Sequence, residues 1–417
     1  MRTFRIITST LNLPLRFVRP TTSKKQFLFS KSELDFHSSN LRSRVRMSSS
    51  STVTEPIFPN FIPVVDKEDQ GSLSRSTSDG LRFRIVSYNI LGQCYVKSSY
   101  FPHSPKPCLR FKARSEAVLS TLKSLESDFL CVQELDEYDS FYKENVESLG
   151  YSSIYIQRSG KKRDGCGIFY KCNGAELVLE DTIDYNDLVE SVQNKAVSIS
   201  SKEDFGDRGD PNDPRVRLKR DCVGIMGAFK LKDLQQHLII VANTHIYWDP
   251  EWTDVKLAQV KYLLSRLARF KEVASNKFGC TSSVVLCGDF NSTPGDKVYE
   301  YLISGNSTVI PMVENTEELP ISLQSVYASI GGEPLFTNCT PGFTGTLDYI
   351  FFFPSGHLKP VSYLELPASP QSADVVGGLP NYYHPSDHLP VGTDFEVCRT
   401  LKFDPGSASI DITKLEL

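Results

Sequence analysis

The sequence predicts an α+β fold, or a layered α/β/β/α arrangement, in one domain over roughly residues 80–400. Many short apolar segments of strand type follow one another, and a few amphipathic segments of helix type are interleaved with them. In addition, a carboxylate, amide or imidazole recurs where an apolar strand ends. These observations together indicate a layered sheet protein with polar chemistry collected at strand ends.

The elements can be placed along the chain by hydrophobic periodicity. The expected strands alternate or run apolar, and they cover residues 81–90, 128–135, 152–157, 166–171, 221–231, 236–246, 282–290, 346–353, 361–366 and 388–397. The expected helices have an apolar stripe, and they cover residues 110–127, 137–148, 253–275 and 296–304. Residues 158–165 and 201–215 are rich in Gly, Pro, Asp and Lys, which indicates loops.

The two ends of the chain have a different character. Residues 1–78 are basic at first, rich in Ser, Thr and Pro and without periodicity, so they are expected to be disordered. This segment suits an organelle transit peptide, and it equally suits a plain basic tail, with Met47 as an internal start. The expected compartment is therefore the cytoplasm or nucleus, or alternatively a mitochondrion or chloroplast. Residues 401–417 are expected to be a C-terminal tail.

Composition narrows the class of protein. No apolar run approaches 18 residues, so no membrane span is predicted. The ten cysteines include no CxxC pair, which favours reduced, buried thiols in an intracellular protein over a disulfide or zinc scaffold. Without the basic first 46 residues, 36 basic and 48 acidic residues remain, a formal net charge of −12. Such a body must bind a polyanion through a local basic patch or a metal ion.

Polar side chains at the strand ends are the candidate functional residues. Each has an ordinary explanation, because a Glu after a strand is usually solvated and an Asn or Asp usually makes a local turn bond. As a set they supply hard oxygen ligands, amides and two imidazoles without a thiolate; they are Asn89, Glu134, His245, Asp289, Asn291, Asp348, Asp387 and His388. This inventory suits Mg²⁺, with Mn²⁺ as a substitute, rather than zinc. The implied chemistry is attack of water on a phosphorus ester.

The motifs resemble those of a known superfamily. "SYNI", "VQE", "NTH", "GDFN", "LDYI" and "SDH" occur in this order over about 300 residues, as in the exonuclease–endonuclease–phosphatase superfamily. The resemblance implies a two-sheet β-sandwich flanked by helices, with the site at one end. The segment "NTHIYWDPEWTDVKLAQV" is most similar to the carbon-catabolite-repressor-type poly(A) deadenylases, whose relatives include nocturnin and the angel proteins. Asp249 and Glu251 replace the basic segment of nocturnin.

The resemblance implies a role for each matching residue. Glu134 would be the principal metal ligand, helped by Asn89. Asp289 and Asn291 would orient the attacking water and hold a second metal, for which Asp387 is another ligand. The phosphate would be stabilised by the two imidazoles and the adenine contacted by a Pro and a Phe; these residues are His245, His388 (oriented by Asp348), Pro250 and Phe343. Arg163 would contact phosphate, or else belong to a solvated charge run.

The implied activity is a Mg²⁺-dependent 3′→5′ exoribonuclease that shortens poly(A) tails of mRNA and releases 5′-AMP. The acidic body would meet RNA through Mg²⁺ and the basic cluster Arg215, Arg217, Lys219 and Arg220. No leucine-rich repeat precedes the nuclease segment, so the resemblance does not carry over stable membership of the large deadenylase scaffold. Three further functions are compatible with the same fold: a phosphatase of a nucleotide such as NADPH, a 2′-phosphodiesterase, and an inactive RNA-binding module.

Overall fold

Two mixed β-sheets stack face to face in the computed structural model, which describes residues 59–64, 80–193, 213–232, 234, 237–304, 319–354 and 357–397. All described residues belong to one compact unit. The seven-stranded sheet has the order β1-β14-β15-β2-β3-β5-β4 and the six-stranded sheet the order β10-β13-β9-β8-β7-β6. A separate two-stranded sheet pairs β11 with β12.

The strand bounds follow the predicted apolar runs closely. The seven-stranded sheet consists of β1 (Phe61–Pro63), β2 (Leu81–Asn89), β3 (Phe129–Gln133), β4 (Tyr151–Gln157), β5 (Gly165–Lys171), β14 (Leu358–Leu364) and β15 (Val391–Val397). The six-stranded sheet consists of β6 (Ala175–Asp184), β7 (Val223–Leu231), β8 (His237–His245), β9 (Thr281–Asp289), β10 (Gln324–Ser325) and β13 (Asp348–Phe352). The small sheet contains β11 (Asn338–Thr340) and β12 (Phe343–Gly345).

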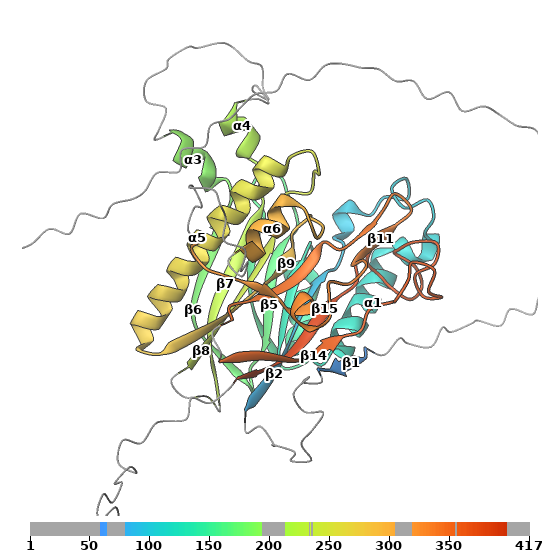
Figure 1. The fold of residues 1–417 in the computed structure, drawn as a ribbon. Helices are drawn as coiled ribbons and strands as arrows, with labels where there is room; N and C mark the ends of the chain where they lie inside the picture. Colours follow the sequence, from blue (N-terminus) through green and yellow to red (C-terminus); the bar gives the residue numbers. More distant parts are fainter. Residues whose placement is uncertain are drawn as a thin grey trace, which may run out of the picture. The chain divides into compact units, whose positions relative to one another are not determined.

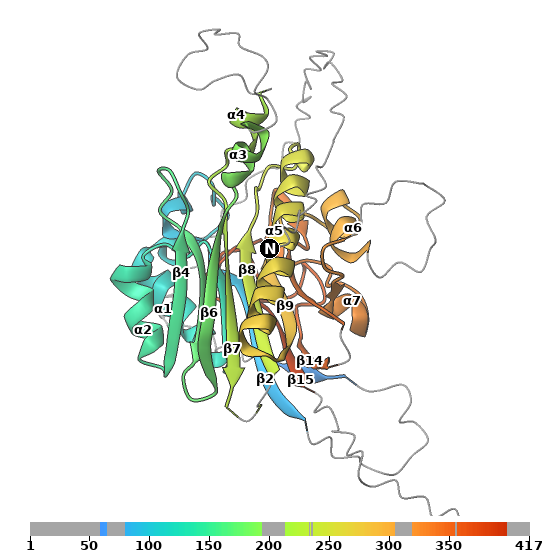
Figure 2. The ribbon, with the colours of Figure 1, turned by 90° about the vertical axis from the view of Figure 1, so that its left-hand side faces the viewer.

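Helices cover the outer faces of both sheets (Figures 1 and 2). They are α1 (Phe111–Ser124), α2 (Lys143–Glu147), α3 (Asp187–Gln193), α4 (Pro214–Leu218), α5 (Thr253–Phe278), α6 (Lys297–Ile303) and α7 (Val326–Ile330). The longest, α5, ends at Gly279, which takes the left-handed conformation (φ 61°) that glycine adopts without strain. Short turns of helix lie at η2 (Gln93–Tyr95), η3 (Lys106–Leu109) and η4 (Tyr138–Tyr142).

Three apolar cores hold the layers together. The first lies between the sheets and includes Phe129 and Phe229, whose rings meet edge to face with centroids 5.0 Å apart. The second packs α5 and α6 on the six-stranded sheet, and the third packs α1 and α2 on the seven-stranded sheet. Truncating a buried ring such as Phe229 would cost about 3–5 kcal/mol. The predicted four-layered α/β/β/α sandwich is therefore confirmed.

Strand direction explains why the polar strand ends meet. In the seven-stranded sheet β2 runs parallel to β3, and in the six-stranded sheet β8 runs parallel to β9, so each parallel pair ends at one edge. The antiparallel neighbours begin at the same edge, because Asp348 is paired with Asp289 and β15 enters beside the end of β2. The last residues of β2, β3, β8 and β9 and the first residues of β13 and β15 therefore lie at the same end of the sandwich.

Some details differ from the sequence predictions. The helix predicted over 137–148 is split, because the backbone N–H of Tyr142 bonds to the carbonyl of Glu137 five residues earlier, which makes η4 a π-helical turn before α2. Strand β6 and the short strands β1, β10, β11 and β12 were not predicted. The range 1–78 was expected to be disordered, but residues 61–63 within it form β1, which pairs with β14. Residues 1–58, 65–78 and 401–417 lie outside the described part of the chain. No helix among the described residues is long and apolar enough to cross a membrane.

Candidate active site

Asn89 links the two sheets at this end of the sandwich. Its Nδ2 donates hydrogen bonds to Oε1 of Glu134 at 3.2 Å and to Oδ2 of Asp289 at 3.0 Å. Its own Oδ1 accepts from the backbone N–H of Leu91, and Oε2 of Glu134 accepts from the N–H of Gly92 at 3.0 Å. One amide therefore holds two carboxylates, one from each sheet, toward a shared point.

The backbone is forced into unusual conformations where these strands end. Leu91, Glu134 and Asn291 have φ angles of 56°, 53° and 44°, in the left-handed region that non-glycine residues rarely adopt. Gly288 has a φ of 156°, and a Cβ there would lie 2.3 Å from the carbonyl oxygen of Thr244. Strained backbone conformations of this kind cluster at functional sites, where the surrounding structure stabilises them.

A second hydrogen-bonded unit joins His388 to Asp348. Nδ1 of His388 lies 2.7 Å from Oδ2 of Asp348, which also accepts from Oγ1 of Thr337 at 2.6 Å. The other ring nitrogen, Nε2, lies 3.7 Å from Oδ2 of Asp289. The segment before His388 is fixed by Ser386, whose Oγ donates to the carbonyl of Asn89 at 2.7 Å. Asp348 thus orients the imidazole of His388 so that Nε2 faces Asp289.

His245 and Asn291 complete the site from the six-stranded sheet. Nε2 of His245 lies 3.5 Å from Oδ2 of Asp289, and its buried Nδ1 has no partner among the described residues. Asn291 donates from its backbone N–H to Oδ1 of Asp289 at 2.9 Å and from Nδ2 to the carbonyl of Ile246 at 3.1 Å. Nζ of Lys256 donates to the carbonyl of Asn291 at 2.7 Å.

Burial and nearby charges raise the pKa values of the two carboxyl groups that Asn89 holds. Burial, with the nearby Asp387 and Asp164, raises the pKa of Glu134 to about 8. Burial and Asp348 raise the pKa of Asp289.

The two imidazoles are shifted in opposite directions. Burial lowers the pKa of His245 despite the opposing effect of Asp289. Burial alone would also lower the pKa of His388, but Asp348 and Asp289 raise it well above its ordinary value. The site therefore holds one neutral and one protonated imidazole.

The carboxylates fit a divalent cation. Buried acceptor atoms Oδ1 of Asp348 and Oδ1 of Asp387 have no hydrogen-bond partner among the described residues. Glu134 and Asp289, whose pKa values are raised, would be stabilised in their ionised form by a positive ion. Ligand atoms of Asp289, Asp348 and His388 lie within 4.8 Å of one another. Because Asp348 already holds Nδ1 of His388, the candidate ligands for such an ion are Glu134, Asp289 and Asp387.

Arg158 and Asp164 lie beside these active-site residues, but they were not among the candidates predicted from the sequence. Nη1 of Arg158 lies 3.4 Å from Oδ2 of the fully buried Asp164, and Oδ1 of Asp164 accepts from the hydroxyl of Tyr95 at 2.5 Å. Arg158 also donates to the carbonyls of Arg220 and Asp221. The loop 158–165 had suggested Arg163, but Arg163 is exposed and pairs with Glu137 at 2.9 Å. That pairing favours a solvated surface charge at Arg163 over a phosphate contact.

A buried amide pair lies directly beneath the site. Nε2 of Gln133 donates to Oδ1 of Asn243 at 2.7 Å across the two sheets. Nδ2 of Asn243 in turn donates to the carbonyls of Val132 and Gly167, both at 2.9 Å. This pair fixes the spacing of β3 and β8, from which Glu134 and His245 project. Neither residue could be recognised from the sequence, since its partner lies more than a hundred residues away.

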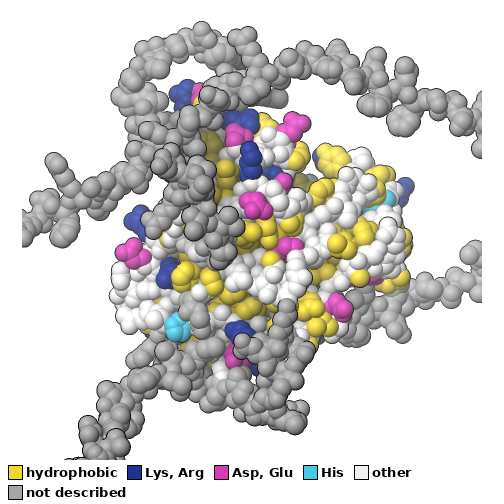
Figure 3. All heavy atoms as spheres, in the orientation of Figure 1, with side chains coloured by type: hydrophobic (Ala, Val, Ile, Leu, Met, Phe, Trp, Pro, Cys, Tyr) yellow, Lys and Arg dark blue, Asp and Glu magenta, His cyan; other side chains and the backbone are white. Residues whose placement is uncertain are grey.

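The predicted adenine-contacting residues are placed on the surface. Pro250 is exposed in the segment between β8 and α5, and Phe343 on β12 is 42% exposed. Of the predicted basic cluster, Arg215 pairs with Asp213 and Arg217 with Asp254. Figure 3 shows Lys and Arg side chains scattered beside Asp and Glu over one face, where the described residues form no broad basic area.

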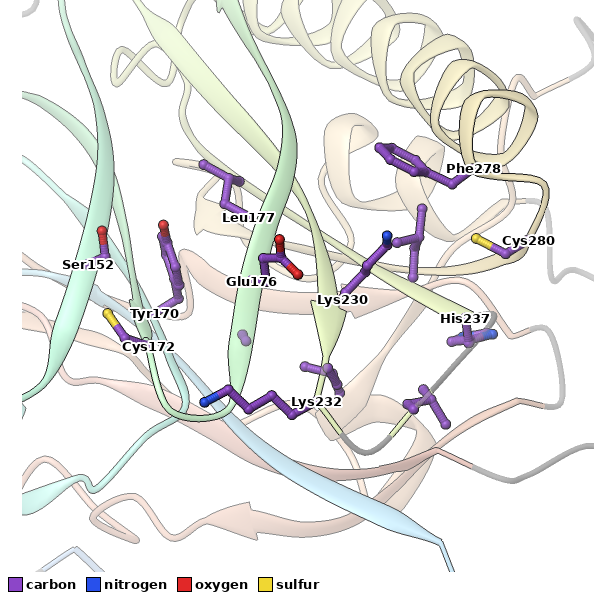
Figure 4. Close-up of a pocket in the computed structure, with 14 residues that line it drawn as sticks. Ser152, Tyr170, Cys172, Glu176, Leu177, Lys230, Lys232, His237, Phe278 and Cys280 are labelled. Atoms are coloured by element: carbon purple, nitrogen blue, oxygen red, sulfur yellow. The ribbon is translucent and has the colours of Figure 1, made fainter.

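A cavity of about 800 Å³ lies away from this chemistry. Its lining includes Lys230, His237 and Phe278, at the opposite ends of β7, β8 and α5 (Figure 4). His237 begins β8 and His245 ends it, a separation of about 26 Å along an extended strand. The hydrogen-bonded polar group, rather than the cavity, therefore defines the candidate active site.

A two-sheet sandwich with carboxylates, amides and oriented imidazoles at one end is the architecture of a metal-assisted phosphoester hydrolase. The chain belongs to the endonuclease/exonuclease/phosphatase family, whose model matches residues 86–388. It is 61% identical over 330 residues to carbon catabolite repressor protein 4 homolog 4 of Arabidopsis thaliana, covering 77% of this chain and 79% of that protein. The resemblance found in the sequence is confirmed.

More distant relatives agree with this assignment. The chain is 30% identical over 342 residues to the CCR4-Not complex 3′-5′-exoribonuclease subunit Ccr4 of Kluyveromyces lactis, covering 76% of this chain and 41% of that protein. It spans about half the length of the fungal relatives that it matches. Among solved structures, ANGEL2, a 2′,3′-cyclic phosphatase, is similar with a TM-score of 0.62 and 26% identity, covering 82% of this chain and 99% of that one.

Proposed function

We propose that this protein is a Mg²⁺-dependent 3′→5′ exoribonuclease that shortens poly(A) and releases 5′-AMP. The observation that carries the proposal is the single amide of Asn89 holding Glu134 and Asp289 together, beside an imidazole oriented by Asp348. The names of the relatives support it, since the fungal ones are 3′-5′-exoribonuclease subunits and the Arabidopsis one is a repressor homologue.

The chain's own residues suggest how the phosphodiester is attacked. Asp289, whose pKa is raised by burial and Asp348, accepts a proton from the attacking water. The peptide N–H of Asn291 fixes this carboxylate, because it donates to the other oxygen of Asp289. The protonated His388 neutralises negative charge on the phosphoryl oxygens, and the neutral His245 donates a hydrogen bond to them.

Glu134, Asp289 and Asp387 would hold the cation in this proposal. Hard carboxylate oxygens without a thiolate favour Mg²⁺, and Mn²⁺ would substitute. When bound, the cation would polarise the phosphodiester and offset the charge that develops during attack. Burial raises the pKa of Glu134 to about 8, so a positive neighbour would favour its ionised form.

A second candidate function is removal of a terminal cyclic phosphate. The similarity to ANGEL2, whose structure is described as that of a 2′,3′-cyclic phosphatase, favours it over a phosphatase of NADPH and over an inactive RNA-binding module. The same group of carboxylates and imidazoles would serve, because both reactions bring water to a ribose-linked phosphorus. The two differ in the bond broken and in the product.

One assay separates these functions. Purified protein is given 5′-labelled A20 RNA, U20 RNA, an RNA ending in a 2′,3′-cyclic phosphate, and NADPH, each with Mg²⁺ or with EDTA. We expect stepwise shortening of A20 and release of 5′-AMP with Mg²⁺ alone. Glu134→Gln and Asp289→Ala should abolish shortening, whereas Glu176→Gln, at the far cavity, should not. Faster turnover of the cyclic phosphate or of NADPH than of A20 would show that this compound, rather than poly(A), is the preferred substrate. Equal activity in EDTA would refute the proposed metal-dependent reaction.

A further inference from the structure

An aromatic and basic cluster lies directly after His245. Tyr247, Trp248 and Trp252 occupy the segment between β8 and α5, and the ring of Tyr247 contacts both tryptophans, with the centroids of Tyr247 and Trp252 5.6 Å apart. Two guanidinium groups cover the ring of Trp252. Cζ of Arg217 lies 4.0 Å and Cζ of Arg220 4.1 Å from its centroid. The contacts are cation–π interactions.

The two arginines differ in how their charge is used. Arg217 is neutralised by Asp254, to which Nε and Nη2 donate at 2.7 and 2.8 Å. Arg220 makes no ion pair among the described residues, and its buried Nε has no hydrogen-bond partner there. Its guanidinium lies over the rings of both Trp252 and Tyr247, with Cζ 4.1 and 5.3 Å from their centroids. Arg220 is therefore a positioned cation that still lacks an anionic partner in the part of the chain that the structure describes.

Trp248 is the exposed member of the cluster. Its side chain is 64% exposed, which is unusual for the largest apolar residue. The segment that carries it is nonetheless fixed, since the N–H of Tyr247 donates to Oε1 of Gln259 at 2.9 Å and the carbonyl of Ile246 accepts from Asn291. Trp248 lies three positions after His245, so their Cα atoms lie within about 11 Å. Trp248 therefore lies at the same end of the sandwich as the active site.

We propose that Trp248 and Arg220 bind nucleotides of single-stranded RNA next to the one being removed, Trp248 by stacking on a base and Arg220 by pairing with a phosphate. This inference rests on the proposed function, because it takes RNA as the substrate. Stacking on an aromatic face tolerates any base, so the surface contributes affinity for a strand rather than choice of adenine. It also supplies the local positive site that an acidic body requires for binding a polyanion.

Binding measured without turnover tests the proposal. Anisotropy of fluorescein-labelled A20 is recorded in EDTA at several KCl concentrations for the wild type, Trp248→Ala, Trp248→Phe and Arg220→Gln. We expect Trp248→Ala to weaken binding roughly 5- to 100-fold with an unchanged salt slope, and Trp248→Phe to restore most of it. Arg220→Gln should reduce the slope of log Kd against log salt by about 0.7, the loss of one phosphate contact.

Control measurements distinguish failure of the binding surface from failure of the proposed function. Arg82→Gln removes an exposed arginine at the opposite end of β2 and should leave affinity and slope unchanged. Thermal unfolding of each variant shows that it is folded. Wild-type affinity in both Trp248→Ala and Arg220→Gln would overturn the binding surface even if poly(A) shortening is observed with Mg²⁺. Absence of shortening by the wild type would instead refute the proposed function, whatever the affinities in EDTA.

Discussion

Nδ1 of His388 lies 2.7 Å from Oδ2 of Asp348, and both groups are buried at the end of the sandwich. The pairing fixes which ring nitrogen faces Asp289 and keeps the imidazole protonated, since Asp348 and Asp289 raise the pKa of His388 against the effect of burial. It also explains how a carboxylate can precede the apolar run of β13. A buried carboxylate is tolerated when it is paired and hydrogen-bonded.

Replacing Asp348 with Asn should lower kcat on A20 roughly 100-fold, because the neutral amide no longer stabilises the positive charge of the ring and accepts a weaker hydrogen bond from Nδ1. Thr337→Val, which removes the second donor to Oδ2, should have a smaller effect. Steady-state kinetics with Mg²⁺ measure both, with Asp181→Asn, a surface carboxylate paired with Arg266, as control. A kcat within about threefold of wild type in a folded Asp348→Asn protein would contradict the orienting role.

Removing the Glu134 carboxylate should abolish metal-dependent stabilisation. The wild type is expected to gain several degrees in Tm with millimolar Mg²⁺ or Mn²⁺, because an ion that binds only the folded state stabilises it. Glu134→Gln keeps the side-chain size but loses the charge, so its Tm should be nearly independent of either ion. Differential scanning calorimetry with and without EDTA checks this. An equal metal-induced shift in both proteins would place the ion elsewhere.

Residues that end apolar strands could be predicted to meet, because strand direction alone brings their ends to one edge. Asn89, Glu134, His245 and Asp289 are of this kind, and the structure places them together with Asp348, which begins β13. Their catalytic roles stay predictions, since geometry alone does not establish a reaction step.

Residues whose partners are distant in sequence could not be predicted. Arg158 looks like one more charge in a basic loop, but besides pairing with the nearby Asp164 it donates to the carbonyls of Arg220 and Asp221, which are distant in sequence. Likewise Gln133 looks like an ordinary strand residue, although it spans the two sheets to Asn243. Periodicity describes which face a side chain occupies, but it does not say which polar group lies on the other side.

Arg114 on α1 supports the site from behind, and its loss should destabilise the fold. The buried guanidinium donates to the carbonyls of Ile90, Leu91 and Pro385 and to Oε1 of Gln93. Arg114→Met leaves these acceptors unpaired, at a cost of about 3 kcal/mol or more in the free energy of unfolding. Urea unfolding measures the change, with the exposed Lys112→Met on the same helix as control. A loss below about 1 kcal/mol would show that water replaces the guanidinium.

His237, at the opposite end of β8, should make stability depend on pH. Its ring nitrogens lie 2.8 Å from Oγ1 of Thr281 and 2.9 Å from Oγ of Ser283, both neutral groups. Burial, with the nearby His357, lowers the pKa of His237 to about 4. Between pH 4 and the unfolded value of about 6.5 the unfolded chain therefore binds a proton that the folded protein does not.

The stabilising effect of a neutral His237 is thus complete above about pH 6.5 and is lost as the pH falls toward about 4. Because pH 5 lies between the folded and unfolded pKa values, we expect the loss at that pH to be about 1–2 kcal/mol rather than the full value of the shift. Urea unfolding at pH 5 and pH 7.5 measures it in the wild type and in His237→Gln, which cannot be protonated. The difference in unfolding free energy between the two pH values should be smaller in His237→Gln, because the other titrating groups are common to both proteins. An identical pH dependence in the two proteins would show that His237 is protonated as readily in the folded state as in the unfolded chain.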